Sequence, residues 1–115
     1  LLYYLKKNPA VRETHLADVA ASYQAAVMDA LALRVERGLA ATGARMLACV
    51  GGVARNALLR QKLDETARRH GARLLLTPLA YCTDNAAMVA AAAGLRAQAG
   101  LDNPPALEAD PSLPL

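Results

Sequence analysis

Two glycines and an asparagine stand where an apolar run gives way to a helical pattern, and this arrangement can hold a phosphate-bearing ligand. Gly51 and Gly52 directly follow the run over residues 46–50, and Asn56 opens the next helical pattern. Glycines let backbone N–H groups approach a nucleotide closely, and a helix N-terminus adds partial positive charge. The spacing matches neither a Walker A loop nor a GxGxxG fingerprint. A tight turn with Asn56 as a helix cap explains the same residues equally well.

A carboxylate occupies the corresponding place after the next predicted strand. Asp84 lies in residues 78–88, which connect that strand to the last helical pattern. The carboxyl ends of parallel strands meet at one edge of a sheet, so we expect Asp84 and Asn56 to converge beside a shared cleft. A carboxylate there suits a divalent metal. A single acidic residue does not make a metal site, however, and a helix cap formed by Thr83 or Asp84 is the simpler interpretation.

The other reactive side chains do not assemble into a recognisable site. His15 and His70 lie far apart in sequence, and neither is placed to activate Cys82 as a nucleophile. Cys49 and Cys82 show no zinc-binding spacing and no disulfide framework. We expect two reduced, partly buried thiols, which is the usual state of cysteines in a cytoplasmic protein.

Helices and strands must alternate to position these groups. Residues 1–5 are interpreted as the end of an earlier element, and residues 6–9 as a loop. A long helix is predicted from about residue 14 to 41, with Thr14 as its N-cap. One face of this helix should carry apolar residues at three- and four-residue steps, namely Leu16, Val19, Tyr23, Val27 and Leu31.

The remaining pattern predicts a strand, a helix, a second strand and a last helix. The run over residues 46–50 fits a strand buried on both faces. A helix over residues 56–70 should face inward with Leu59, Leu63 and Ala67 and end before Gly71. A second strand is predicted at 73–77 and a last helix at 83–99, with residues 100–115 as an extended tail. Two strands joined by a helix should lie parallel, which gives half of an α/β domain.

Composition narrows the functional class only slightly. The chain has 115 residues, of which 55% are hydrophobic, and a net charge of +3. The basic residues between 55 and 73 are interpreted as a solvated helix face with Arg60–Asp64 and Glu65–Arg69 pairs. The longest uninterrupted apolar run, residues 86–95, is about half of a membrane span, so no membrane association is expected.

Three segments together resemble the C-terminal part of the TsaD family, which older usage calls O-sialoglycoprotein endopeptidase or glycoprotease. They are GGVARNALLR at 51–60, YCTDNAAM at 81–88 and DVAASYQ at 18–24. The similarity covers most of the chain, and YCTDNAAM is its most specific part. It implies that residues 1–115 are a C-terminal fragment of a transferase that belongs to the actin-like ATPase group of RNase H-like folds.

The resemblance also implies an activity and site residues. The activity is tRNA modification, in which a threonylcarbamoyl group passes from threonylcarbamoyl-adenylate to N6 of adenosine 37. By position, Gly51 and Gly52 match the turn beside the nucleotide, and Asn56 matches an asparagine that binds the adenylate. Asp84 matches an aspartate that ligates iron or zinc. The implied partners are tRNA and TsaB- and TsaE-like proteins.

The chain also departs from the family pattern. The family's remaining metal ligands form a His-x-x-x-His pair in its N-terminal part, and this sequence contains no such pair. Arg55 stands where a small residue is common. We therefore expect the fragment to bind metal weakly and to be inactive alone.

Two other functions would fit part of the pattern. A sugar kinase of the same fold group carries a similar Gly-Gly turn, but there an Ala-Leu-Gly loop replaces the residues Cys82 to Asn85. A non-catalytic interaction module would use the long helix as a binding face. The isolated chain is expected to expose an apolar sheet edge and to self-associate.

Overall fold

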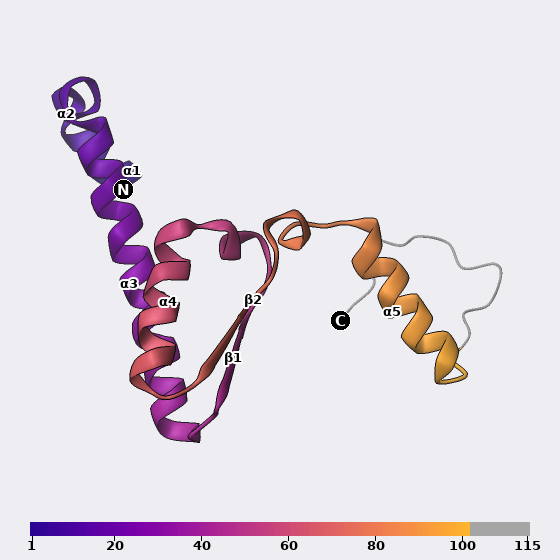
Figure 1. Cartoon of the computed structure of the whole chain (residues 1–115). Coiled ribbons are helices and arrows are strands. Elements are labelled where there is room, and N and C mark those ends of the chain that lie inside the picture. Colours follow the sequence, from indigo (N-terminus) through magenta and orange to yellow (C-terminus); the bar gives the residue numbers. More distant parts are fainter. Residues whose placement is uncertain (102–115) are drawn as a thin grey trace. The chain divides into compact units, whose positions relative to one another are not determined.

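The computed structural model describes residues 1–101, which form two compact units, one covering Leu1–Thr83 and the other beginning at Asp84. Most of the predicted tail, from residue 102 onward, lies outside the described residues. Figure 1 shows the order of the elements along the chain. The first unit contains α1 (Leu2–Lys7), α2 (Pro9–Thr14), α3 (Leu16–Thr42), β1 (Met46–Cys49), the 3-10 turn η1 (Gly52–Arg55), α4 (Ala57–Arg69), β2 (Arg73–Leu76) and the 3-10 turn η2 (Leu79–Tyr81).

Helix α4 forms the centre of the first unit, as its sequence pattern predicts. Leu59, Leu63 and Ala67 recur at four-residue steps, so they share one helix face, and all three are buried. Asn56 caps the helix by accepting a hydrogen bond from the N–H of Leu59. Gly71 follows the helix with a φ of 63°, the left-handed conformation that glycine adopts without strain.

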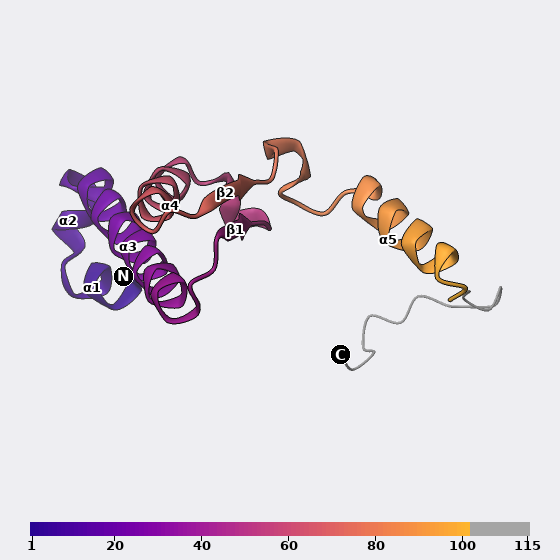
Figure 2. The ribbon, with the colours of Figure 1, turned by 60° about the horizontal axis from the view of Figure 1, so that its bottom comes forward.

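The two strands pair in parallel, as predicted, and leave one face of their sheet uncovered within the first unit. Met46 lies beside Arg73 and Cys49 beside Leu76 in the register. Leu47, Cys49 and Leu74 are half-buried and pack toward the core around α4. Met46, by contrast, is 60% exposed. The prediction that the first strand is buried on both faces is therefore wrong, because helices cover only one side of the pair in this unit (Figure 2).

Helix α3 packs on α4 from about its middle onward. Its buried residues are Met28 and Leu39, and Leu31 and Val35 pack against the same core. The N-terminal half of α3 extends past α4 in Figure 1. Three residues of the predicted apolar face, namely Leu16, Tyr23 and Val27, are therefore exposed.

Within the described part of the chain, α3 is also the one helix whose length and apolar composition would allow it to cross a membrane. The core helix of a soluble protein passes the same test. Two acidic residues of α3 form ion pairs with α4: Asp29 with Lys62 at 2.5 Å and Glu36 with Arg69 at 3.4 Å. These pairs and the buried Met28 make α3 a packing partner of α4 in this structure.

The start of the chain is helical, which corrects the predicted loop. Helix α1 ends at Lys7, and α2 begins at once with Pro9 in its first turn. Proline is favoured there because its fixed φ suits a helix and the N–H that it lacks would have no partner. Thr14 ends α2 and bonds back to the carbonyl of Ala10, so it does not cap α3. The residue before α3 is His15.

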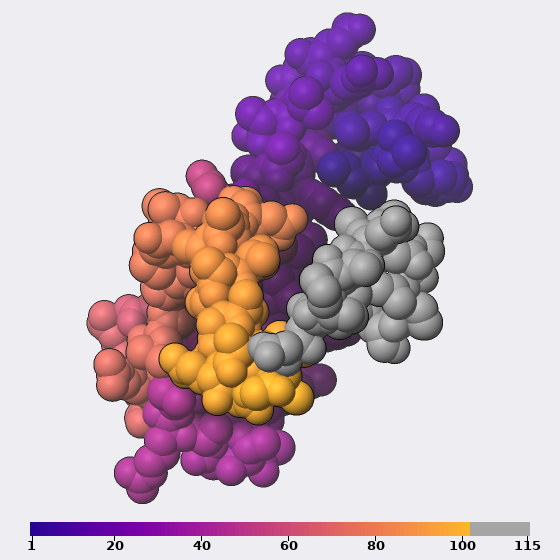
Figure 3. All heavy atoms as spheres, turned by 90° about the vertical axis from the view of Figure 1, so that its right-hand side faces the viewer, coloured from indigo at the N-terminus to yellow at the C-terminus, as the bar shows by residue number. Residues whose placement is uncertain are grey.

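In the second unit, α5 (Ala86–Gln98) begins later than predicted. Asn85 caps it by accepting a hydrogen bond from the N–H of Met88 at 3.0 Å. The helix is followed by Gly100 with a φ of 68°, close to its predicted end. Every residue of α5 is exposed, and Figure 3 shows its side chains in orange to yellow.

Candidate functional site

The Gly-Gly turn leaves β1 and returns toward α4 through η1. Gly51 has a φ of 86°, which side-chain-bearing residues rarely adopt. The N–H of Ala54 bonds to the carbonyl of Gly51, and the N–H of Asn56 bonds to the carbonyl of Val53, both at 3.0 Å. Ala54 is only 1% exposed. The turn is therefore fixed from inside, while its glycines face outward.

The structure constrains the two glycines differently. The backbone conformation of Gly51 itself demands glycine. Gly52 has no positive φ, and a Cβ added there would meet nothing within 4 Å among the described residues. Neither strain nor packing in this part of the chain explains a glycine at 52. An open backbone at this position is what a close-lying ligand needs.

Asn56 makes two hydrogen bonds with its side-chain amide. Its Oδ1 accepts from the N–H of Leu59 at 3.0 Å, which is the cap, and its Nδ2 donates to Oε1 of Gln24 at 3.1 Å. The cap interpretation is therefore confirmed. An amide nitrogen carries two hydrogens and its oxygen two lone pairs, so one donor and one acceptor remain for a ligand.

Arg60 lies one turn into α4 and points inward at the same end of the sheet. Its Nε donates to the carbonyl of Ala54 at 2.5 Å, and its Nη2 donates to the carbonyl of Thr77 at 2.6 Å. Nη2 also lies 3.4 Å from Sγ of Cys82. The predicted Arg60–Asp64 pair is thus wrong, because Asp64 pairs with Arg68 at 2.7 Å. In the predicted Glu65–Arg69 pair, Arg69 instead forms an ion pair with Glu36 of α3.

The segment that follows β2 is anchored by Cys82. This thiol is 2% exposed and donates toward the carbonyls of Thr77 at 3.6 Å and Pro78 at 3.5 Å. Arg55 adds a further link from the Gly-Gly turn, with Nη1 3.3 Å from the carbonyl of Leu79. Both cysteines are free, as expected. A thiol so deeply buried has an anchoring role.

The pKa of the Cys49 thiol reflects its surroundings at the carboxyl end of β1. Burial raises the pKa of the Cys49 thiol, the positive charge of Arg60 offsets part of that rise, and Cys82 adds to it. The field of Arg60 therefore reaches the end of β1 as well as the segment after β2.

Asp84 is the first residue of the second unit, and its side chain is exposed. The prediction that Thr83 or Asp84 caps α5 is wrong, because Asn85 takes that role. The carboxylate of Asp84 is thus not used by the helix. Its convergence with Asn56 stays a prediction. Over residues 1–101, no three His, Cys, Asp or Glu side chains group closely enough to hold a metal ion.

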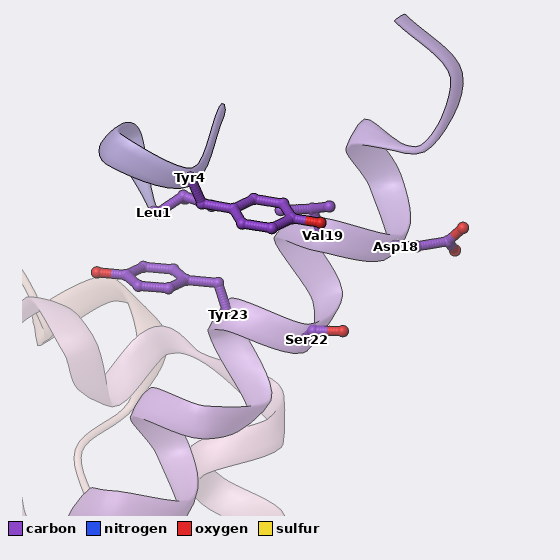
Figure 4. Close-up of a pocket in the computed structure, with 6 residues that line it drawn as sticks. All are labelled: Leu1, Tyr4, Asp18, Val19, Ser22 and Tyr23. Carbon is purple, nitrogen blue, oxygen red and sulfur yellow. The ribbon is translucent and has the colours of Figure 1, made fainter. Parts of the chain in front are cut away.

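A hollow of about 410 Å³ lies between α1 and the N-terminal half of α3. In Figure 4 the ring of Tyr4 lies above and to the right of the ring of Tyr23, and Asp18 and Ser22 point away from the ring of Tyr23. The DVAASYQ segment therefore serves two places: Tyr23 faces α1, whereas Gln24 reaches Asn56.

Gln24 and Arg60 are the site residues that sequence reasoning missed. Gln24 stands at the end of a segment noted for its resemblance, yet its partner is 32 positions away. The alternation of basic and acidic residues around Arg60 predicts a solvated face, which hides its role. Arg60 could have been identified from its position, because it lies one turn after the predicted cap on a helix with a buried face.

Comparison with known proteins gives one consistent result. The family model "TsaD: tRNA N6-adenosine threonylcarbamoyltransferase" matches residues 3–91. Proteins named tRNA N6-adenosine threonylcarbamoyltransferase from Thermotoga neapolitana and Salinibacter ruber are each 44% identical, over 98% and 100% of this chain. One of the same name from Bordetella petrii is 48% identical over 74% of it. The first two matches cover only 34% and 36% of those relatives, so the chain spans about a third of their length. No solved structure matches.

Proposed function

The chain belongs to the TsaD family of tRNA N6-adenosine threonylcarbamoyltransferases, and from this premise we propose that it supplies part of the substrate site of such an enzyme. The proposed reaction moves a threonylcarbamoyl group from threonylcarbamoyl-adenylate to N6 of adenosine 37 in tRNA. The new bond joins N6 to the carbamoyl carbon, the bond from that carbon to the phosphate oxygen breaks, N6 loses a proton, and AMP leaves.

The proposal gives this chain the C-terminal share of an actin-like ATPase fold. The parallel strand pair, with helices on one side, supports an α/β lobe of this kind. Because the chain spans about a third of its relatives, we assign it a share of the site, not the whole reaction.

One observation carries the proposal: the open backbone at Gly52 beside the held amide of Asn56. The turn lies at the carboxyl end of β1, where ligands bind in open α/β sheets. Asn56 keeps a donor and an acceptor after capping α4, so the same residue can cap the helix and bind the adenylate. Arg60 adds positive charge nearby, which favours an anionic ligand.

Asp84 is proposed as one ligand of a divalent metal, either iron or zinc. One carboxylate does not hold such an ion, since structural and catalytic zinc sites use three or four protein ligands. The described residues offer no group of three candidate ligands. The donor set of residues 1–101 therefore does not fit the metal by itself, and no step of the reaction is assigned to it here. We propose that the other ligands come from outside this chain.

The proposed partners follow from the family. They are tRNA as the acceptor substrate, and TsaB- and TsaE-like proteins as companions. The two free cysteines support a cytoplasmic location.

The proposal is tested by assaying the protein expressed from its full coding sequence. The protein is incubated with tRNA, threonylcarbamoyl-adenylate and the partner proteins, and the tRNA is digested to nucleosides for mass spectrometry. Threonylcarbamoyladenosine should form, and it should be lost when adenosine 37 is replaced by guanosine. A protein that is folded but yields no modified nucleoside with any tRNA that reads ANN codons would refute the proposal.

A further inference from the structure

Arg60 joins three segments that are far apart in the sequence. Its guanidinium donates to Ala54 of η1, to Thr77 just after β2, and toward Cys82, at 2.5, 2.6 and 3.4 Å. Ala54 lies in the turn that carries Gly52. Cys82 lies two positions before Asp84.

All three of these acceptors are uncharged. Over residues 1–101, no carboxylate forms an ion pair with Arg60. A partly buried charge without a counterion is costly unless its N–H groups are satisfied. Arginine meets this requirement with donors in a planar fork, and a lysine ammonium offers a single point of donation. The contacts of Arg60 therefore depend on the shape of the guanidinium as well as on its charge.

The geometry points to a positioning role: we propose that Arg60 fixes the turn at 51–55 and the segment at 77–82 at a set separation and orientation. This inference rests on the proposed function, since those two segments carry Gly52 and lead into Asp84. Arg60 itself need not touch the substrate. It holds the backbone of the turn that carries Gly52 and of the segment that leads into Asp84.

The core of the unit does not depend on Arg60. Met28, Leu59 and Leu63 form the buried cluster, and the other ends of the strands are joined by a backbone bond from Arg73 to Arg45. Loss of the guanidinium fork should loosen the turn at 51–55 and the segment at 77–82 and leave this core in place.

The first experiment measures motion by ¹⁵N relaxation in the 115-residue chain, at concentrations where sedimentation shows it to be monomeric. The variants are Arg60→Lys, which keeps the charge but not the fork, and Arg60→Met, which keeps neither. Arg68→Met is the matched control, because the Arg68 side chain is 78% exposed and its ion pair with Asp64 lies within α4. We expect faster or exchange-broadened motion at residues 52–55 and 77–82 in both Arg60 variants and in neither segment of the control. Wild-type rigidity in Arg60→Lys, or loosening spread equally over α3 and α4, would overturn the positioning role.

The second experiment measures transfer by the protein expressed from its full coding sequence, at temperatures where circular dichroism shows every variant folded. Displacing binding groups by an ångström lowers rates by roughly ten- to a hundredfold. We expect losses of this size in kcat/KM for threonylcarbamoyl-adenylate, similar in Arg60→Lys and Arg60→Met. Rescue by lysine would show that charge alone matters and would overturn the proposal. If the wild type transfers nothing, the proposed function fails, and the relaxation experiment still decides the role of Arg60.

Discussion

The side chain of Asn56 donates a hydrogen bond from Nδ2 to Oε1 of Gln24 across 3.1 Å, and this bond links the N-terminal half of α3 to the start of α4. The other half of the same amide caps α4 through the N–H of Leu59. Asn56 is thus held by two elements at once. Its proposed contact with the adenylate and its role in stability can be separated by substitution.

Replacing Asn56 by serine should separate the cap from the ligand contact. Serine caps helices nearly as well as asparagine, whereas alanine costs about 1 kcal/mol at such a position. Asn56→Ser keeps the cap but loses the bond to Gln24, whereas Asn56→Ala loses both, so we expect the serine variant to unfold between the wild type and the alanine variant. Both variants should bind threonylcarbamoyl-adenylate at least about tenfold more weakly, since each loses the amide. Full affinity in Asn56→Ser, measured by calorimetry, would reduce Asn56 to a cap.

Gln24 should matter through the acceptor that it offers to Asn56. Gln24→Glu keeps an oxygen for Nδ2, so it should retain most of the affinity for the adenylate. Gln24→Leu leaves Nδ2 without that partner, at a cost of about 1 kcal/mol in stability, and should raise the KM for the adenylate. Gln61→Leu is the control, because Gln61 donates to Glu65 on the exposed face of α4. Equal KM values in the glutamate and leucine variants would contradict the orienting role.

The two glycines of the turn should respond differently to alanine. At Gly51 the φ of 86° makes alanine strained, so Gly51→Ala should lower the free energy of unfolding by about 1 to 3 kcal/mol. At Gly52 an added methyl group meets open space, so stability should be unchanged. That methyl group would occupy the place proposed for the adenylate, and Gly52→Ala should therefore lose affinity. Urea titration and calorimetry check the two effects, and a Gly52→Ala protein that binds normally would argue against a ligand at the turn.

Much of the fold was predictable from local signals. Gly71 and the four-residue steps of Leu59, Leu63 and Ala67 define α4, and the apolar runs on either side define the strands. The start of the chain was not predictable in this way, because Pro9 fits both a loop and the first turn of a helix. The extent of burial along α3 was not predictable either, since it depends on where α4 ends, which is a property of tertiary packing.

The site residues were predictable only where the residue type itself indicates a local backbone structure. Gly51, Gly52 and Asn56 stand out because their residue types suit a turn and a helix cap. Gln24 and Arg60 make contacts across 32 and 17 positions, and no local pattern encodes such partners. The role of Asp84 in a cleft shared with Asn56 remains a prediction from topology.

Cys49 should report the charge of Arg60 through its pH dependence. Burial raises the pKa of the Cys49 thiol and Arg60 offsets part of the rise, so the thiolate forms at higher pH than in a free peptide, whose thiol pKa is about 8.5. The folded state thus favours the neutral thiol, and its contribution to stability is lost as the pH rises toward the folded pKa. Alkylation by iodoacetamide, followed by peptide mass spectrometry, should show a midpoint above that of the peptide. Arg60→Met should move the midpoint higher still. A lower midpoint would contradict the effect assigned to the positive charge of Arg60.

The uncovered face of the sheet should make the 115-residue chain self-associate. Met46 and Leu75, on the face away from α4, are 60% and 37% exposed, and the strand pair has no helix over that face in its own unit. Apolar surface of this kind drives association because burying it removes it from water. Sedimentation velocity over a range of concentrations should show a rising average mass, and Met46→Thr with Leu75→Thr should shift the curve toward the monomer. Leu33→Gln removes a 46% exposed leucine from α3 instead and serves as the control. A wild-type chain that stays monomeric at every concentration would contradict this prediction and would show that this face is stable in water without a cover.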